Sequence, residues 1–411
     1  MTMKKLLLAE AAELLKPGMT AFIHGTTSEP RALVEYLAEH PHHMAGVHLI
    51  TSFIPGINNI QLAGIAPGSR LTTFMAQPAL HDAIASGQAE ALRLPYSALA
   101  GFFAELPRLD IAFVQGRICV DHSFSTGITG ELIPVACDKA ETICVINNGL
   151  MATPVSGCQI PAQRADFVVD ADAPLIEYIT ADRTDAVSEK IAANVAGLVR
   201  DGDTIQAGLG VIPGAVFALL AKHRKLRVFS GMVSDALIPL AESGALDDDA
   251  MHVYGMAMGS AQLYAWLDGR RGFEVAGVER THDRETLRSI ERFVAINSAI
   301  EVGLDGSINA EQLGSRTISG PGGLPDYAFG GSRSAGGRSI IALPSANHKR
   351  GISRIVRRVA NAQAPTLPAS SVTHVVTEHG VAEFAGATST QIAERLISIA
   401  DPAHRQQLGD G

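Results

Sequence analysis

Aromatic residues and cysteines are both scarce in this sequence. Aromatics make up 5% of the 411 residues whereas 40 residues are glycine, a balance that suits α/β proteins with many tight turns between strands and helices. The four cysteines form no C-x-x-C pair and lie mostly in apolar runs. We therefore interpret them as buried, reduced thiols.

An excess of positive charge and a long apolar run are also missing. The formal net charge of −9 argues against nucleic acid or an anionic membrane as the main partner, although local loops of an acidic protein still bind small anions. No apolar run approaches the length of a bilayer crossing, and Glu10 and Glu13 interrupt the apolar stretch near the N-terminus. That stretch favours an amphipathic helix over a signal peptide, so we expect a soluble, cytoplasmic protein.

Several common cofactor and catalytic motifs are absent as well. There is no G-x-S-x-G elbow and no Walker A motif. The run GLGVIPG at Gly208–Gly214 lacks the spacing of a dinucleotide fingerprint, because Pro213 precedes its last glycine. The run HPHH at 40–43 has no carboxylate or cysteine beside it. We expect neither a nicotinamide cofactor nor a metal.

The sequence does contain an internal repeat. LLKPGMTAFIHGTTSEPRALVEYLAEH at Leu14–His40 resembles LVRDGDTIQAGLGVIPGAVFALLAKH at Leu198–His223, with Gly18 aligned to Gly202. Each copy predicts a helix, a glycine turn, a short strand, a loop of small residues and a helix with proline in its first turn. An apolar strand then follows each copy, at Val47–Thr51 and at Leu226–Ser230.

This alternation of strands and helices predicts α/β domains with largely parallel sheets. A repeat spaced by about 184 residues is too long for a solenoid and indicates two domains of similar fold, at 1–183 and 184–411. Thr184 or Asp185 is the expected cap of the helix that opens the second copy. Further strands are predicted at Leu109–Gln115, Thr142–Asn147, Phe293–Val302, Ser339–Pro344 and Thr373–Glu378.

The second half carries the segments with chemical potential. Ser319–Gly337 is rich in glycine, which lets a ligand approach the backbone and lets successive N–H groups point at one oxyanion, unless it is simply a surface loop. Lys349 and the run Gly351–Arg358 form a basic cluster that is either a solvated face or a phosphate clamp. Exposed N–H groups near Gly208 and Gly210, before a predicted helix, also favour an anion.

Candidate acids and bases lie near the ends of two predicted strands. Asn297 and Glu301 have the period-2 spacing that puts side chains on one face of a strand, and Glu378 and His379 end another strand. Each of them is equally consistent with a structural role at a turn or cap. From the residues alone, the chain is a duplicated α/β, enzyme-like protein with a glycine-rich anion site in its second half.

The whole chain resembles the acetyl-CoA hydrolase/transferase family, in particular its 4-hydroxybutyrate CoA-transferase-like members. The similarity is sharpest from Gly202 onwards, and its motifs occur in the family order. They are GDTIQAGLGVIPGAV, FVAINSAIEVGLDGSINAEQLG, SGPGGLPDYAFGG, GGRSIIALPSA, SRIV and HVVTEHGVAE, with a weaker NNGLMATPVSG in the first half.

The resemblance implies two similar α/β domains with the active site between them. It also implies acyl-CoA and a carboxylate as substrates and a homodimer as the assembly. In this family a glutamate attacks the thioester and passes through a glutamyl-CoA intermediate, in two ping-pong halves. Oxyanion binding then falls to Gly322 and Gly323, with Asn297 beside them. For CoA binding the resemblance indicates Gly208, Gly210, Gly330, Gly331, Lys349 and Arg354.

The sequence departs from the family pattern at one decisive position. The nucleophilic glutamate is expected just before M-x-S-D, and here that stretch is VFSGMVSD, with Gly231 in its place. Glycine has no nucleophile, so the glutamyl route is lost and space opens beside the thioester. His379 replaces a tyrosine of the family, and Arg117–Gly127 replaces a proline-rich loop.

Three functions follow as hypotheses. In the first, water or a second substrate attacks the thioester, with Glu301, Asp326 or His379 as general base, so that the enzyme is a hydrolase or an acyltransferase. In the second, CoA transfer proceeds with another nucleophile or through a ternary complex. In the third, the chain binds acyl-CoA without turnover. An engineered Glu→Gly change at position 231 is a further explanation of the glycine.

Overall fold

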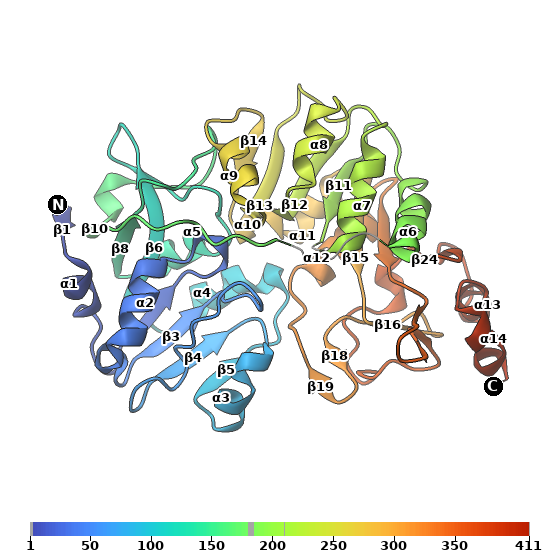
Figure 1. Ribbon diagram of the computed structural model, residues 1–411, viewed down its shortest axis with the longest axis horizontal. Coiled ribbons are helices and arrows are strands. Elements are labelled where there is room, and N and C mark those ends of the chain that lie inside the picture. The colour runs from blue at the N-terminus through green and yellow to red at the C-terminus, as the bar shows by residue number, and fades with distance from the viewer. Residues whose placement is uncertain (1–2, 180–184, 209, 411) are drawn as a thin grey trace. The chain divides into compact units, whose positions relative to one another are not determined.

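The structure is a computed structural model that describes all residues except 1–2, 180–184, 209 and 411 (Figure 1). The chain divides into two compact units, Met1–Ile179 with Val253–Thr281, and Thr180–His252 with His282–Gly411. The domain boundary predicted at 183/184 lies outside the described residues. The sequence division also differs from these units in one segment, since Val253–Thr281 belongs with the first unit and not with the C-terminal part.

The first unit is built on a parallel sheet. Its main path runs through β1 (Lys4–Lys5), β10 (Phe167–Asp170), β8 (Thr142–Asn147), β6 (Ile111–Ile118), β2 (Thr20–Ile23), β3 (His48–Thr51), β4 (Arg70–Thr73) and β5 (Ala89–Ala91). The short strands β7 (Phe124–Ser125) and β9 (Gln159–Ile160) extend the end of β6 as an antiparallel ribbon. The unit also contains α9 (Ala261–Leu267), β14 (Phe273–Val275) and α10 (Val278–Thr281).

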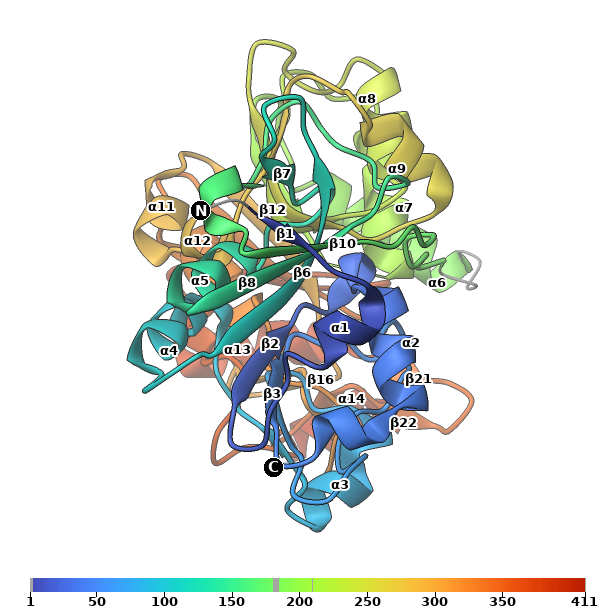
Figure 2. The same ribbon diagram turned by 90° about the vertical axis from the view of Figure 1, so that its left-hand side faces the viewer.

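Both faces of this sheet are covered by helices, as Figure 2 shows. Ala21 and Ile23 of β2 join one apolar core with α1 (Leu8–Ala12) and α2 (Arg31–Glu39), while Phe22 joins a second core with α4 (Leu99–Glu105) and α5 (Ile133–Lys139). Successive residues of a strand point to opposite faces, which explains why this strand is apolar at each position from Ala21 to Ile23.

The second unit has a sheet of the same kind. Its strands run in the order β12 (Arg227–Val233), β11 (Thr204–Ala207), β15 (Phe293–Ser298), β20 (Arg338–Ala342), β24 (His374–Thr377) and β25 (Gly380–Glu383). The pairs from β12 to β24 are parallel, and only β25 pairs antiparallel within this path. The helices are α6 (Ala186–Ala196), α7 (Val211–Leu220), α8 (Leu237–Glu242), α11 (Arg284–Ser289), α12 (Leu324–Arg333), α13 (Ser389–Ser398) and α14 (Pro402–Gly409).

The structure confirms the repeat. The run β2–α2–β3 of the first unit corresponds to β11–α7–β12 of the second. In each sheet a later strand pairs with the other edge of the repeat's first strand: β6 pairs with β2, and β15 pairs with β11. Ligands of open α/β sheets bind beyond the carboxyl ends of the strands at such switch points. The expected cap of α6 is also confirmed at Asp185, whose side chain accepts a hydrogen bond from the Ser188 N–H at 2.8 Å.

Two sequence predictions are corrected by the fold. The single strand predicted at Phe293–Val302 is two strands, because β15 ends at Ser298 and β16 (Glu301–Gly303) pairs instead with β17 (Ile308–Asn309) and β23 (Ile355–Val356). Asn297 and Glu301 therefore do not share a strand face. The glycine-rich segment is also not one loop, since α12 begins at Leu324 within it.

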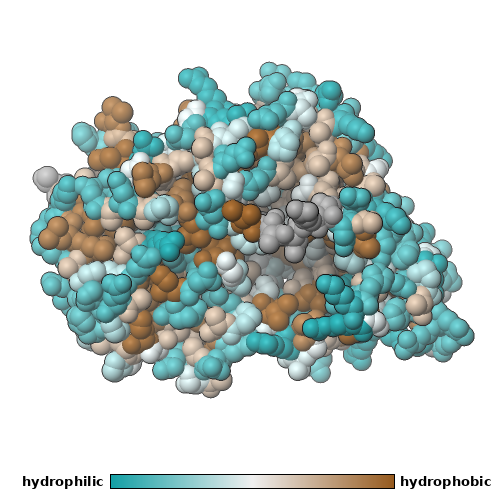
Figure 3. Space-filling view, viewed as in Figure 1, coloured by the Kyte–Doolittle hydropathy of each residue, from teal (hydrophilic) through white to brown (hydrophobic). Residues whose placement is uncertain are grey.

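The described residues contain no helix that is both long and apolar enough to cross a membrane. On the face drawn in Figure 3, hydrophilic residues predominate and hydrophobic residues form separate groups between them.

Candidate active site

Gly231 lies on the buried part of β12, and the place of its missing side chain is occupied. A Cβ atom built on Gly231 would lie 2.8 Å from the Tyr327 hydroxyl and 2.9 Å from Nε2 of His282. Real Cβ atoms do not approach other atoms so closely. The expectation that the glycine opens space beside the thioester is therefore wrong, since an imidazole and a phenol fill that space.

His282 is held between two glycines. A Cβ atom on Gly323 would also collide with its Nε2 and Cδ2 atoms and would lie 3.0 Å from Cε2 of Tyr327. The rings of His282 and Tyr327 are tilted at 56° with centroids 4.8 Å apart. The imidazole of His282, which lies between α10 and α11, thus meets the end of β12 and the turn before α12. It needs glycine at positions 231 and 323.

Burial sets the charge of this histidine. Only 4% of His282 is exposed, and desolvation lowers the pKa of its imidazole to about 3. At neutral pH the ring is therefore uncharged, so one nitrogen is a hydrogen-bond donor and the other an acceptor. A neutral imidazole is a weak base but a good hydrogen-bond donor.

Gly322 and Gly323 form the turn that leads into α12. Gly322 has φ +56°, a left-handed conformation that favours glycine, and Gly323 is the N-cap residue of the helix. In α12, Pro325 has no N–H group, and the N–H groups of Asp326 and Tyr327 both donate to the Gly323 carbonyl at 3.1 Å. The N–H groups of Gly323 and Leu324 therefore remain for an anion at this helix start, where the helix dipole places partial positive charge. The turn thus has the chemistry of an oxyanion site, next to the imidazole and the phenol.

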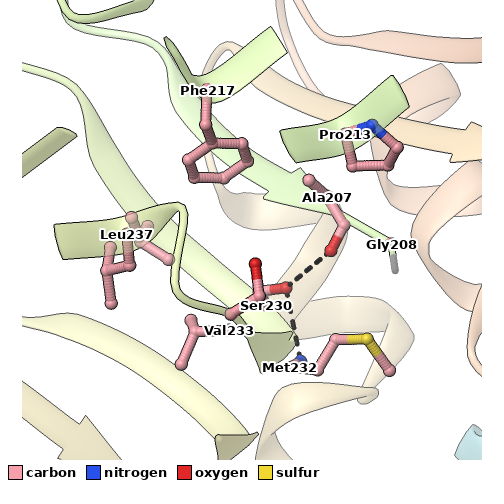
Figure 4. A pocket seen from close by; sticks show the side chains of 10 residues that line it. Ala207, Gly208, Pro213, Phe217, Ser230, Met232, Val233 and Leu237 are labelled. Carbon is pink, nitrogen blue, oxygen red and sulfur yellow. Dashed lines mark hydrogen bonds between the residues drawn. The ribbon is translucent and has the colours of Figure 1, made fainter. Parts of the chain in front are cut away.

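The other side of β12 has a cavity of about 20 Å³, which is space for one water molecule (Figure 4). The Ser230 hydroxyl donates to the Ala207 carbonyl at 3.5 Å and accepts from the Met232 N–H at 3.4 Å. Pro213 and Phe217 of α7 close this space from above the strand. The cavity is too small for an acyl chain.

Asn297 and Gly208 lie together at the switch point of this sheet. The Asn297 amide exchanges two hydrogen bonds with the Gln206 amide, at 3.0 and 3.3 Å, and a Cβ on Gly208 would lie 3.3 Å from Asn297 Oδ1. Gly210 has φ +123° and precedes α7. This pair of amides joins β11 to β15 beside Gly208.

Asp326 is fully buried in the first turn of α12, next to Tyr327 in the sequence. Its Oδ1 accepts a hydrogen bond from Nε of Arg284 at 3.0 Å. This ion pair joins α12 to α11. Among the three acids and bases proposed from the sequence, Asp326 is the one that shares an element with the Gly323–Tyr327 turn.

Glu301 is engaged in structural contacts. Its Oε1 accepts hydrogen bonds from the Asn309 side chain at 3.0 Å and from the Ala360 N–H. These bonds link β16, β17 and the loop after β23. These contacts give Glu301 a structural role in the small sheet. Glu301 belongs to β16, whereas Asn297 belongs to β15.

His379 belongs to a different group of polar residues, beyond β24. Its Nε2 lies 3.6 Å from Oε1 of Glu378, and the same carboxylate accepts from the hydroxyl and N–H of Ser345 at 2.6 and 2.9 Å. β24 is four strand spacings from β12, which at about 4.8 Å each is roughly 19 Å. His379 and Gly231 are therefore at opposite parts of the sheet edge.

Gly330 and Gly331, in the second half of α12, allow close packing of this helix. A Cβ on Gly330 would lie 2.8 Å from Cβ of Leu287, and a Cβ on Gly331 would lie 2.5 Å from the Arg338 carbonyl oxygen. Both residues are buried within α12. Close helix packing accounts for them without a ligand, so we do not retain them as CoA contacts.

Of the two basic residues, Lys349 is exposed in the turn between β21 (Ala346–Asn347) and β22 (Ile352–Ser353). Arg354 is half-buried, and its Nη1 donates to the Ile300 carbonyl at 3.4 Å. Its Nε has no hydrogen-bond partner among the described residues. Arg354 thus lies beside the loop that separates β15 from β16, and Lys349 does not contact this loop in any described bond.

The sequence reasoning missed His282 and the role of Tyr327. Tyr327 was visible only as an interruption of a glycine run, and His282 stands in the polar stretch ERTHDRET, where nothing marks it as buried. The two glycines were the available signal, because a side chain at position 231 or at position 323 would collide with His282. Only the tertiary structure identifies His282 as the side chain that lies against both glycines.

Comparison with known proteins identifies the family of this chain. Residues 259–411 match the family description "Acetyl-CoA hydrolase/transferase C-terminal domain". The chain is 30% identical to butyryl-CoA:acetate CoA-transferase of Anaerostipes caccae, over 76% of this chain and 74% of that protein. It is 29% identical to 4-hydroxybutyrate coenzyme A transferase of Clostridium kluyveri, over 98% and 96% of the two chains. The chain therefore belongs to the acetyl-CoA hydrolase/transferase family and is an enzyme that processes acyl-CoA thioesters.

Solved structures support the fold over the same length. RipA from Yersinia pestis superimposes with a TM-score of 0.88 at 23% identity, covering 98% of this chain and 96% of that one. A 4-hydroxybutyrate CoA-transferase from Porphyromonas gingivalis gives a TM-score of 0.82 at 24% identity, with the same coverage. The two-domain α/β class expected from the sequence is confirmed.

Within the described part of the chain, no group of three or more His, Cys, Asp or Glu side chains is arranged to hold a metal ion.

Proposed function

We propose that this enzyme hydrolyses acyl-CoA thioesters, or transfers their acyl group, without a covalent glutamyl-CoA intermediate. One observation supports the proposal: the volume beside Gly231, where the family resemblance places the nucleophile, is filled by His282 and Tyr327. A carboxylate side chain has no room to begin there. The substrate is coenzyme A in the form of its acyl thioester.

The turn at Gly322–Gly323 supplies the proposed oxyanion site. Charge develops on the thioester oxygen when a nucleophile attacks its carbonyl carbon, and fixed hydrogen-bond donors stabilise that charge. Backbone N–H groups before α12 have this role in the proposal. The uncharged His282 imidazole, with its pKa lowered to about 3 by burial, supports the turn as a hydrogen-bonding group.

Asp326 is our proposed general base. It forms an ion pair with Arg284, and it lies in the first turn of the helix that follows the proposed oxyanion turn. It would take a proton from water as the water oxygen bonds to the carbonyl carbon. The carbon–sulfur bond then breaks, the proton passes to the CoA thiolate and the free acid leaves. Glu301 is bound within its own small sheet and His379 lies across the sheet, so both are weaker candidates.

CoA transfer to a carboxylate acceptor is the second candidate. It is favoured by the names of the relatives, each of which is called a CoA transferase. Without a glutamate at position 231, transfer requires a direct attack of the acceptor carboxylate in a ternary complex or a nucleophile elsewhere. Binding of CoA thioesters through the basic residues Lys349 and Arg354, without turnover, is the remaining alternative. A cytoplasmic homodimer is the expected state, and light scattering of the purified chain measures its mass.

Mass spectrometry of acyl-CoAs incubated with the protein separates these functions. We expect free CoA and free acid to form in the absence of any carboxylate acceptor, and no CoA adduct on the protein. New acyl-CoAs that form only when a carboxylate is added would establish transfer. A CoA adduct on a carboxylate of the wild-type chain would contradict the proposal. Saturable binding of all thioesters without products would leave a binding protein.

A further inference from the structure

Asp326, the proposed general base, lies where α11 and α12 meet. Its side chain is fully buried, and its Oδ1 accepts a hydrogen bond from Nε of Arg284 at 3.0 Å. Arg284 is the first residue of α11, and 45% of its side chain is exposed. The ion pair thus links a buried acidic group of one helix to a half-exposed guanidinium of the other.

The start of α11 sets the direction of the Arg284 side chain. Asp283 is the N-cap residue of this helix, and its carboxylate accepts from the N–H group of Thr286 at 2.8 Å and from the Thr286 hydroxyl at 2.7 Å. A capped first turn has a defined backbone geometry. Because His282 and Arg284 flank the cap residue, one capped turn orients both the imidazole of the site and this guanidinium.

α12 holds the same guanidinium from the other side. Cζ of Arg284 lies over the Phe329 ring, 5.4 Å from its centre, in a cation–π contact about one helical turn after Asp326. The two helices approach closely here, since a Cβ atom on Gly330 would lie 2.8 Å from Cβ of Leu287. A planar guanidinium that lies over one turn and donates to the turn before it has little rotational freedom.

The hydrogen bond through Nε is specific to arginine. Nε carries one N–H group in the plane of the guanidinium, so its bond to Oδ1 restricts the orientation of the Asp326 carboxyl group. Lysine instead has an amine with three rotatable donors at the end of its chain. A general base must lie within hydrogen-bond distance of the proton that it removes, and small displacements of a catalytic group cost large factors in rate.

We propose that Arg284 is the positioning residue of Asp326. It acts on the reaction through the orientation of the Asp326 carboxyl group and does not itself contact the substrate. This inference rests on the proposed function, in which Asp326 takes a proton from water. A purely structural ion pair would instead stabilise the contact between α11 and α12 and leave the reaction unchanged in a folded variant.

The test measures kcat and KM for hydrolysis of one acyl-CoA by the full-length parent chain, by Arg284→Gln, by Asp326→Asn and by the double variant. We expect Arg284→Gln to lower kcat at least about tenfold with KM within about twofold of the parent, because a displaced base slows proton transfer and leaves binding intact. In the Asp326→Asn background the same change should lower kcat by less than about twofold, since no base is left to position.

Arg288→Gln is the matched control, because Arg288 is an exposed arginine of the same helix that pairs with Glu285. Its kcat should stay within about twofold of the parent, since exposed ion pairs contribute little. Arg284→Lys keeps the charge and loses the Nε donor. It should unfold thermally at the parent temperature and still lose kcat several-fold, and it carries the test if Arg284→Gln does not fold.

The outcomes separate this inference from the proposed function. Equal kcat in Arg284→Gln, Arg284→Lys and Arg288→Gln would overturn the positioning role and leave Asp326 as the proposed base. An equal fractional loss from Arg284→Gln in the parent and in the Asp326→Asn background would also overturn it, since the arginine would then act independently of Asp326. A parent chain without hydrolysis, or Asp326→Asn with parental kcat, would contradict the proposed function and this inference with it.

Discussion

At the scale of single residues, the unusual feature is a glycine whose missing side chain is replaced by other side chains. Glycine has no side chain of its own, yet Gly231 limits which residue β12 can have at this position. His282 and Tyr327 occupy the position into which any larger residue would project. The chemistry of the site is therefore decided by the pair of rings as much as by the absence of a carboxylate.

The first prediction is that Gly231→Glu destabilises the protein and that His282→Ala relieves the damage. The clash of a Cβ with two buried rings should lower the free energy of unfolding by about 1–3 kcal/mol, as overpacked cores do. The double variant Gly231→Glu/His282→Ala should recover part of this loss, measured by urea unfolding. Gly101→Glu is the control, because a Cβ there meets no atom within 4 Å.

The same variants test what position 231 means for the reaction. If it is the position of the family nucleophile, the double variant should gain a covalent CoA adduct that intact-protein mass spectrometry detects, while the parent chain has none. If neither protein forms an adduct, the glutamate introduced at position 231 does not act as a nucleophile even when His282 is removed.

The second prediction concerns the general base. Asp326→Asn should lower turnover of an acyl-CoA at least about 100-fold, the usual size of a general-base effect. Glu301→Gln is the matched control, since Glu301 bonds only within its small sheet, and its turnover should stay within a few-fold of the parent. Thermal unfolding of both variants distinguishes lost chemistry from lost folding. Similar turnover in both would disprove the assignment of Asp326.

At the scale of elements, α12 connects the parts of the site. Its first turn carries the glycine turn, Asp326 and Tyr327, and its second half packs through Gly330 and Gly331 onto α11 and β20. One helix thus has two requirements for glycine. The turn at Gly322 needs a left-handed backbone, whereas the buried pair needs close approach.

The third prediction compares two helical glycines. Gly→Ala in a helix normally stabilises by up to about 1 kcal/mol. Gly331→Ala should instead destabilise by about 1–3 kcal/mol, because its Cβ would lie 2.5 Å from the Arg338 carbonyl oxygen. Gly214→Ala in α7, where a Cβ meets nothing within 4 Å, should follow the normal rule. Denaturant unfolding measures both, and a stabilised Gly331→Ala would contradict the packing argument.

At the scale of the whole molecule, buried titratable groups make stability depend on pH. Burial lowers the pKa of His282 to about 3 and that of His252 to about 4, and it raises the pKa of Glu29 to about 7. Below pH 6.5 the unfolded histidines bind protons that the folded ones do not. Above pH 4.5 the unfolded Glu29 ionises while the folded one stays protonated.

The fourth prediction follows from these signs. The two histidines should make stability fall as the pH drops from 6.5 towards 4, and Glu29 should make it fall as the pH rises from 4.5 to 7. His282→Gln should flatten the acid side, and Glu29→Gln should flatten the change up to pH 7, in urea midpoints measured across this range. The exposed His42 gives the control His42→Gln, which should leave the profile unchanged. An unaltered acid slope in His282→Gln would mean that this imidazole is already accessible to protons.

Local patterns in the sequence were sufficient for the class and the repeat. The β2–α2–β3 and β11–α7–β12 runs follow from apolar strands, a glycine turn and a proline near the helix start, all of which are short-range signals. The motifs around Gly322 and Asp326 likewise depend on residues that are neighbours in the chain. The strand at Phe293–Val302 failed, because an apolar run does not reveal that the backbone leaves one sheet for another after Ser298.

The sequence by itself thus determined the α/β class, the duplication, the family and the glycine at position 231. Only the tertiary structure decided what that glycine faces, since Gly231, His282 and Tyr327 come from distant parts of the chain and meet through packing. It also showed that Glu301 bonds to Asn309 and Ala360, and that His379 follows a strand four places from the strand of Gly231. Contacts between residues remote in sequence leave no periodic signal in either of them, which is the physical reason that the site had to be seen folded.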